Sequence, residues 1–379
     1  MADLLNVEHL SVSFFTPAGE VQSVRDVSFS LKAGEVLAIV GESGCGKSVT
    51  SLSLMQLVQA PQGQIVSGSI RFEGTDYSYD EKRNKIPIYK LDENGNQVFD
   101  EKGKPVIETN EFGVPQYKTE RKVFDIAKMP KYEMHRIRGN LVAMIFQEPM
   151  TSLNPVFTIG NQLDEVTLLH VEGATKEYAK KRSIEMLELV GIAMPENIYK
   201  RYPHELSGGM RQRVMIAMAL ACNPKVIIAD EPTTALDVTI QAQILDLLRN
   251  LKDRINSSIM LITHDLGVIA EMADYVVVMY AGRVVEKGTA QEIFANPAHP
   301  YTIGLMASKP IVGKKVDRLY SIPGKVPNPV NMPNYCYFKD RCEMALPCCD
   351  GEYPCEISLS PTHKVSCYRY YENNRKAGE

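Results

Sequence analysis

The sequence of 379 residues predicts an α/β protein built around a buried parallel sheet. Three continuous apolar runs of strand length support this prediction: "VLAIV" at 36–40, "KVIIAD" at 225–230 and "SSIMLITHD" at 257–265. Runs of this kind are typical of parallel strands buried on both faces. Amphipathic stretches with helical periodicity, such as "AKKRSIEMLELVGI" at 179–192, lie between them. Strands that alternate with helices predict the α/β class.

Composition narrows the class of protein further. The net charge is −4, and Lys and Arg are scattered along the chain, so the sequence predicts no nucleic-acid surface. No apolar run reaches the roughly 20 residues that a membrane-spanning helix needs, and the start "MADLLNVEHL" lacks the features of a secretion signal. We therefore expect a globular chain that stays in the cytosol.

The N-terminal third combines short strands with an unusual polar segment. Residues 1–75 alternate apolar and polar positions, which predicts small antiparallel strands around the buried run at 36–40, with a helix from about Lys47 to Val58. Within residues 77–123, "DENGNQVF" and "DEKGKPVI" repeat an eight-residue unit, and "NEFGVPQY" echoes it. Asn-Gly and Lys-Gly between β-forming residues predict hairpins. We interpret 77–123 as an insertion, either a solvated decoration or a partner-binding element.

The remainder of the chain divides into a helical part and a cysteine-rich part. The pattern from 124 to 225 is mainly helical. Beyond about Pro297 the chain becomes rich in Pro and then Cys, and six of the eight cysteines fall between Cys336 and Cys367. In a reducing cytosol such a group favours a metal site over disulfides. We place a domain boundary here, with one domain at 1–296 and a C-terminal domain at 297–379.

The strongest chemical signal is "GESGCGKS" at 41–48, which fits the pattern G-x-x-x-x-G-K-[ST] between a predicted strand and a predicted helix. In such a P-loop, backbone N–H groups converge on phosphate oxygens at a helix N-terminus. Lys47 would neutralise the β- and γ-phosphates, and the Ser48 hydroxyl can bind Mg²⁺. The sequence therefore predicts a nucleoside triphosphate site.

Acidic and polar residues follow the later strands. Asp230 and Glu231 end the run "VIIADE", where Asp230 suits Mg²⁺ and Glu231 suits the base that orients an attacking water. Gln147 in "MIFQEPM" and His264 in "LITHD" also emerge at strand ends. Taken alone, Gln147 is more typical of an ordinary loop amide, and His264 of a core or surface histidine.

A second glycine pair opens another helix at "LSGGMRQR", residues 206–213. Ser207 is a good N-cap, and Gly208 and Gly209 expose backbone N–H groups at a helix start. Two phosphate-binding ends for one nucleotide make sense if two chains pack head to tail, so that the helix end of one covers the γ-phosphate held by the other. The alternative is a helix that simply begins with Ser-Gly-Gly.

The order GESGCGKS, Gln147, LSGGM, VIIADEP, "ALD" at 235–237 and His264 resembles the ATPase subunit of ABC transporters over roughly residues 4–290, excluding the insertion. The resemblance implies a P-loop NTPase of ABC type, with an antiparallel β subdomain, a helical subdomain at about 148–222 and a small Cys-rich C-terminal domain. It implies catalytic roles for Glu231, His264 and Gln147, and Mg²⁺ ligation by Ser48, Gln147 and Asp230. The implied nucleotide contacts are Phe14, stacked on adenine, and Gly41, Ser43, Gly44, Cys45, Gly46, Lys47, Ser48 and Val49 of the P-loop. Ser207, Gly208 and Gly209 would contact the opposite subunit's ATP, and Asp237, also in the nucleotide site, would lie in the loop between the subunits.

Finer features are similar to one branch, the ATP-binding subunits of oligopeptide and dipeptide importers. They are "MIFQEPMTSLNPV", "YPHELSGGMRQRVMIAMALACNP", "NPAHPYTIGLM" and the Cys-rich tail. The branch implies two transmembrane permease subunits, a second and nonidentical ATPase chain or a homodimer, an extracytoplasmic peptide-binding protein, and a place at the cytoplasmic face of the membrane. In some members the tail binds a [4Fe–4S] cluster, and Cys336, Cys342, Cys349 and Cys367 match its pattern. Zinc, or no metal, are the alternatives.

Two points stay open at the level of sequence. Cys45 stands where Ser is common, and beside Lys47 at a helix N-terminus we expect a lowered thiol pKa and a reactive group. The cargo is open too, because specificity lies mainly in other subunits, so nickel or another small solute is an alternative to peptides. A soluble ABC ATPase of DNA repair or translation is the rival class, although the chain shows neither a coiled coil nor two ATPase halves.

Overall fold

A computed structural model describes residues 3–234, 236–308 and 320–371. The larger of its two sheets has eight strands in the order β11-β12-β10-β9-β3-β8-β7-β6. The five strands β9, β3, β8, β7 and β6 run parallel. Their bounds are Tyr275–Tyr280, Val36–Val40, Ser258–Thr263, Val226–Asp230 and Val142–Ile145. The predicted parallel sheet is confirmed, and all three apolar runs lie in it.

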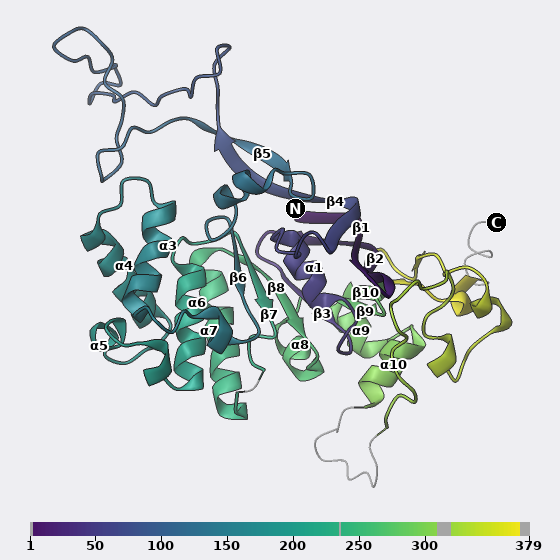
Figure 1. Cartoon of the computed structure of the whole chain (residues 1–379). Coiled ribbons are helices and arrows are strands. Elements are labelled where there is room, and N and C mark those ends of the chain that lie inside the picture. Colours follow the sequence, from purple (N-terminus) through teal and green to yellow (C-terminus); the bar gives the residue numbers. More distant parts are fainter. Residues whose placement is uncertain (1–2, 235, 309–319, 372–379) are drawn as a thin grey trace.

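The parallel strands are buried on both faces because their side chains alternate between two cores. In β8, Met260 and Ile262 belong to one core, whereas Ile259 and Leu261 belong to the other. The first core lies toward the smaller sheet. The second is shared with α3 (Ile159–His170), α4 (Lys176–Leu189), α5 (Pro195–Tyr199), α6 (Gly208–Leu220) and α7 (Val238–Ile255), which Figure 1 shows gathered on one side of the molecule. Because both faces of each strand are covered, the strands have continuous apolar sequences and not alternating ones.

The smaller sheet is antiparallel, in the order β2-β1-β4-β5. Its strands are Gly19–Lys32, Asp3–Thr16, Gly63–Tyr77 and Thr119–Asp125. Helix α1, Lys47–Leu54, contacts β1 and β2 of this sheet and β7 of the larger one, so it lies between the two sheets. The helix ends earlier than predicted because Gln56 has a left-handed backbone, with φ 48°. Packing between the two sheets holds α1, and the glycine-rich loop that precedes it, against the parallel sheet.

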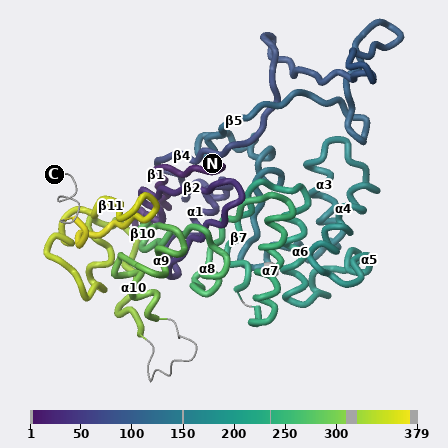
Figure 2. Tube along the Cα trace, turned by 180° about the vertical axis from the view of Figure 1, so that it is seen from behind, coloured from purple at the N-terminus to yellow at the C-terminus, as the bar shows by residue number. Residues whose placement is uncertain are grey.

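The insertion between β4 and β5 contains four turns of one kind. Asp80, Asp92, Asp100 and Asn110 each accept two backbone N–H groups, from the residues two and four positions later. Sequence reasoning found the last three and missed the first, "DEKRNKIP" at 80–87. There Arg83 takes the left-handed position, φ 64°, that glycine takes in the others. None of the residues 80–118 is fully buried, and Figures 1 and 2 show the segment projecting from the molecule.

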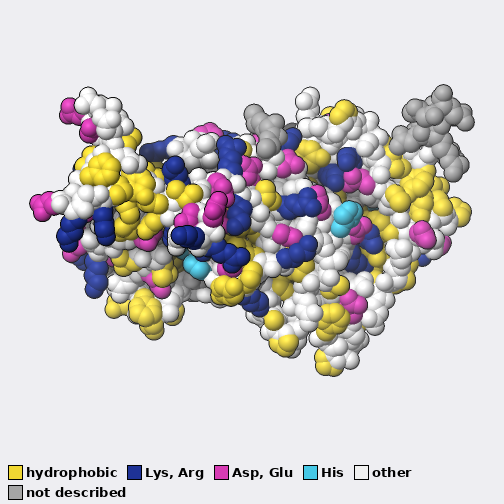
Figure 3. All heavy atoms as spheres, turned by 90° about the horizontal axis from the view of Figure 1, so that it is seen from above, with side chains coloured by type: hydrophobic (Ala, Val, Ile, Leu, Met, Phe, Trp, Pro, Cys, Tyr) yellow, Lys and Arg dark blue, Asp and Glu magenta, His cyan; other side chains and the backbone are white. Residues whose placement is uncertain are grey.

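The insertion touches the helical part at its last repeat. Phe112 packs edge-on against Tyr178 of α4, with 4.6 Å between ring centroids, and Asn110 Nδ2 donates to Glu172 O at 3.1 Å. The exposed apolar side chains Tyr79, Leu91 and Phe99 lie in this segment. From above, Figure 3 shows hydrophobic side chains gathered at the end of the molecule where the insertion lies.

The shorter helical elements complete the chain. The remaining α-helices are α2 Pro149–Ser152, α8 Leu266–Met272, α9 Ala290–Ala295 and α10 Pro300–Ala307. The 3₁₀ turns are η1 Lys131–Arg136, η2 Pro203–Glu205, η3 Lys339–Arg341, η4 Pro347–Asp350 and η5 Tyr368–Tyr370. The last three turns belong to the C-terminal segment, residues 320–371, which carries little regular structure.

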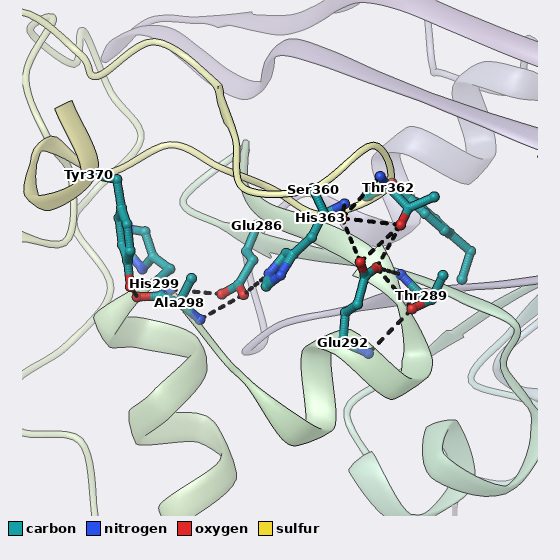
Figure 4. Close-up of polar contacts among 10 residues, drawn as sticks. Glu286, Thr289, Glu292, Ala298, His299, Ser360, Thr362, His363 and Tyr370 are labelled. Carbon is teal, nitrogen blue, oxygen red and sulfur yellow. Dashed lines mark hydrogen bonds and ion pairs between the residues drawn. The ribbon is translucent and has the colours of Figure 1, made fainter. Parts of the chain in front are cut away.

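The C-terminal segment attaches to the sheet through buried polar contacts. Strands β11 (Ile357–Ser358) and β12 (Lys364–Val365) extend the sheet beyond β10 (Arg283–Thr289). Beneath them the buried carboxylate of Glu286 contacts His363 Nε2 at 2.7 Å and accepts the backbone N–H groups of Ala298 and His299, both at 2.8 Å (Figure 4). Because every oxygen of this carboxylate is engaged, its burial is compensated.

Candidate nucleotide-binding site

The glycine-rich loop 41–48 connects β3 to α1 and is tightly held. Lys47 is buried, and its Nζ donates to the carbonyls of Gly41 at 2.7 Å and Glu42 at 3.0 Å. Gly46 has φ 91°, and a Cβ there would lie 2.3 Å from Ser23 O, so this position requires glycine. Ser43 and Gly44 are exposed, while Val49 is half-buried in α1. The loop thus presents backbone N–H groups and one ammonium group at a helix start, as anion binding needs.

Ser48 and Asp230, the two residues expected to bind Mg²⁺ together with Gln147, lie within hydrogen-bond distance of each other beside this loop. Ser48 Oγ donates to Asp230 Oδ1 at 3.1 Å, and Ser51 Oγ donates to Oδ2 at 3.3 Å. Burial raises the pKa of Asp230, although both hydroxyls oppose that shift. A hydroxyl and a carboxylate are the oxygen ligands that Mg²⁺ prefers. Sequence reasoning missed Ser51, yet the spacing of three residues from Ser48 on a helix places both on one face.

Glu231 is the centre of a second cluster. Its Oε2 accepts from Gln147 Nε2 at 3.0 Å and from Thr234 Oγ1 at 2.8 Å, and His264 Nδ1 lies 3.3 Å from its Oε1. Glu231 itself has a left-handed backbone, φ 47°, which is rare outside glycine and concentrates at functional sites. Three residues from three strand ends therefore converge. Thr234 is a further member that the sequence reasoning did not identify.

The second glycine pair lies apart in the helical region. Ser207 caps α6, because its Oγ accepts from Met210 N at 3.4 Å. Asp237 caps α7 in the same way, accepting from Ile240 N at 2.9 Å. The two helix starts are neighbours, since a Cβ on Gly209 would lie 3.0 Å from Ile240 Cγ2. Ser207, Gly208 and Asp237 are exposed, whereas Ala235 of "ALD" lies outside the described residues.

Phe14 and Cys45 complete the expected nucleotide contacts. Phe14 on β1 is half-buried, with its ring over Gly63. Cys45 is fully buried, and burial raises the pKa of its thiol, outweighing the opposing effect of Lys47. A buried, protonated thiol is a poor nucleophile. The expectation of a lowered pKa and a reactive Cys45 is therefore wrong, because desolvation outweighs the neighbouring charge.

The four tail cysteines that match the branch pattern lie near one another. The Cys336 thiol interacts electrostatically with Cys342, Cys349 and Cys367, and burial, with these neighbours, raises its pKa to about 12. Cys348 and Cys355 are exposed. Within the described ranges, however, no three His, Cys, Asp or Glu side chains converge at metal-binding geometry. The structure thus brings the four thiols into one neighbourhood without forming a ligand shell.

Comparison with known proteins extends these observations. A family model described as "ABC transporter" matches residues 24–102 and 112–234, and one described as "Oligopeptide/dipeptide transporter, C-terminal region" matches 285–349. The fold is similar to that of the dimeric ATP-binding cassette MJ0796 in a post-hydrolysis state bound to ADP and Pi. The TM-score is 0.56 at 22% identity, over 76% of this chain and 98% of that one.

Relatives of similar length carry matching descriptions. The chain is 44% identical to the oligopeptide transport ATP-binding protein AppD of Bacillus subtilis, over 98% of each chain. It is 44% identical to the dipeptide transport ATP-binding protein DppD of the same species, over 97% of this chain and 95% of that one. No helix within the described residues is long and apolar enough to cross a membrane. The chain belongs to the ABC transporter family, among the ATP-binding proteins of oligopeptide and dipeptide transport.

Proposed function

We propose that this chain hydrolyses ATP to power the import of dipeptides or oligopeptides through separate membrane subunits. The observation that carries the proposal is the convergence of Gln147 and His264 on Glu231, one residue from the Asp230–Ser48 contact at the P-loop. This arrangement combines a phosphate cradle, an oxygen site for a hard cation and a carboxylate base. The family membership and the names of its relatives supply the transported class.

Each residue then has a role that its position supports. Backbone N–H groups of 41–48 and the Lys47 ammonium bind the phosphates, and Phe14 contacts the adenine. ATP and Mg²⁺ are the ligands expected of ABC ATPases. Ser48, Asp230 and Gln147 would hold the cation, which when bound stabilises phosphate charge. Glu231 accepts the proton of the attacking water, His264 steadies the γ-phosphate, and Thr234 and Gln147 orient the Glu231 carboxylate.

The exposed start of α6 supports a dimeric mechanism. Ser207, Gly208 and Gly209 would cover the ATP held by a second ATPase chain, with Asp237 beside them. That second chain would be a related, nonidentical subunit or another copy of this one. Two permease subunits would bind near residues 147–154, at the cytoplasmic face of the membrane, and a peptide-binding protein would deliver cargo from outside.

Replacement of Glu231 by Gln tests the assignment of the base. The amide keeps the shape of the side chain but cannot accept a proton, so turnover should fall about 10²–10⁴-fold, the usual size of a general-base contribution. Equilibrium binding of a fluorescent ATP analogue should not change. Glu188→Gln, at an exposed position on α4, is the control for removing a carboxylate elsewhere. Hydrolysis near the wild-type rate would disprove the role of Glu231.

For the tail, we propose a [4Fe–4S] cluster bound by Cys336, Cys342, Cys349 and Cys367, with zinc as the alternative. The support is the donor set, since four thiolates suit either group, together with the mutual proximity of the four thiols. When bound, the group would cross-link a segment with little regular structure of its own.

Metal analysis of the full chain purified without oxygen tests this proposal. A cluster predicts about four irons and four sulfides per chain, with visible absorption. Cys342→Ser should lower that content, and Cys348→Ser, at an exposed neighbouring cysteine, should not. Zinc at about one per chain would favour the alternative. A purified chain without iron or zinc would contradict the proposal of a metal in the tail. The ATPase assignment would not be affected.

A further inference from the structure

The C-terminal segment reaches directly into the P-loop. Arg341, at the end of η3, is nearly buried, with 5% of its side chain exposed. Its guanidinium holds the Glu42 carboxylate with two bonds, Nη1 to Oε2 at 2.6 Å and Nη2 to Oε1 at 3.0 Å. Glu42 is the second residue of "GESGCGKS". A fork-to-carboxylate contact of this kind fixes both distance and orientation.

The backbone of Glu42 is fixed as well. Its N–H donates to the hydroxyl of Tyr301, on α10, at 2.9 Å. Its carbonyl accepts from Lys47 Nζ at 3.0 Å and from Cys45 N at 3.3 Å. Glu42 thus connects the phosphate-binding lysine on one side to Arg341 and Tyr301, both outside the ATPase motifs, on the other.

Arg341 is itself held rigidly. Its Nε donates to Pro323 O at 2.7 Å, and its Nη1 also donates to the Tyr280 hydroxyl at 3.3 Å. The guanidinium lies 5.6 Å from the centroid of the Tyr280 ring and 5.9 Å from that of Phe338. A side chain fixed by this many partners transmits its position rather than adapting to the loop.

We infer that Arg341 is a positioning residue of the nucleotide site, which sets the conformation of the P-loop through Glu42 and so tunes affinity for the phosphates of ATP. The C-terminal segment is in this way a part of the ATP site. This inference rests on the proposed function, because it assumes that the loop 41–48 binds ATP.

The test compares Arg341→Gln and Arg341→Lys with the wild-type full chain. Arg341→Gln removes the fork, so the Kd for an ATP analogue and the KM for ATP should rise about tenfold, within the range of typical couplings between sites. The fall in kcat should be smaller, because none of the groups assigned to bond breaking is altered. Arg341→Lys keeps the charge but not the two-pronged geometry, and should restore part of the affinity.

Matched variants distinguish an effect of Arg341 on the P-loop from a general effect on the stability of the fold. Lys339 lies in the same 3₁₀ turn as Arg341 and pairs with Asp350 of η4. Lys339→Gln breaks this ion pair without altering a contact to the P-loop, and should bind ATP like the wild type. Because both act through one contact, Arg341→Gln combined with Glu42→Gln should raise Kd no more than the larger single change. An unchanged Kd in folded Arg341→Gln, additive effects in the double variant, or an equal loss in Lys339→Gln would each overturn the inference. Failure of the wild type to bind ATP would instead overturn the proposed function.

Discussion

The two glycine-rich helix starts of this molecule, at α1 and α6, differ in how much of their surroundings the chain itself supplies. The start of α1 is enclosed, since Gly46 and Lys47 are buried and Glu42 is bound from both sides. The start of α6 is open, since Ser207 and Gly208 are exposed and the Ser207 side chain caps the helix locally, by accepting from Met210 N. Both present N–H groups suited to anions. The difference fits the dimer proposed above, in which one end binds its ligand within the chain and the other acts on a ligand held by a partner.

Changing one residue at each end should separate binding from hydrolysis. Ser207→Arg places a bulky side chain at the open end, so turnover in the assembled ATPase should fall about 10²–10³-fold, as when a preorganised donor is lost. ATP binding to the isolated chain should not change. Lys47→Ala removes the ammonium group at the enclosed end, and should weaken binding itself about 10- to 100-fold. The measurements are analogue binding to the isolated chain and ATP turnover of the assembly.

Thr175→Arg is the control for the open end, because Thr175 is also an exposed N-cap and accepts from Tyr178 N at 3.2 Å. This substitution removes a comparable N-cap, at the start of α4, and leaves Gly208 and Gly209 unchanged. Weakened ATP binding in Ser207→Arg would contradict the comparison, since it would mean that the open end serves the chain's own nucleotide.

The parts of this molecule that could be predicted from sequence are those with local causes. A run such as "VLAIV" is apolar throughout because both faces of the strand are covered, and "GESGCGKS" needs its glycines for its own backbone. The hairpins of the insertion were also found, apart from the first repeat, where Arg83 hides the pattern by replacing glycine. Local rules therefore recovered the parallel sheet and the phosphate loop.

Contacts between distant segments could not be predicted in the same way. The pair Arg341–Glu42 joins residues 299 positions apart, and no periodicity or motif links them. The expected direction of the Cys45 pKa shift was wrong for a related reason. The sequence shows its neighbour Lys47, whose charge lowers the pKa of the thiol, but not the burial that outweighs this charge and raises the pKa. Tertiary packing, and not a local rule, sets these features.

The start of α1 depends on α10, which carries Tyr301, and the N-cap of α10 is His299, which should make this helix sensitive to acid. His299 Nδ1 accepts the Tyr301 N–H at 3.0 Å, which requires that this nitrogen carry no proton. Burial lowers the pKa of His299 to about 4, a shift that the Glu286 carboxylate opposes only in part. The unfolded chain takes up this proton below its ordinary pKa of about 6.5, whereas the folded chain takes it up only near 4.

The stability that His299 contributes should therefore be fully present above about pH 6.5 and should be lost as the pH drops toward 4. Between pH 7 and pH 5, the protonation of His299 should lower the free energy of unfolding by about 2 kcal/mol. His299→Asn keeps an acceptor for the Tyr301 N–H but cannot titrate, so it should lose less stability over the same range by about that amount. Because the chain has no tryptophan, urea unfolding would be followed by circular dichroism at both pH values. Equal losses in wild type and variant would show that the protonation of His299 does not cause the loss of stability in acid.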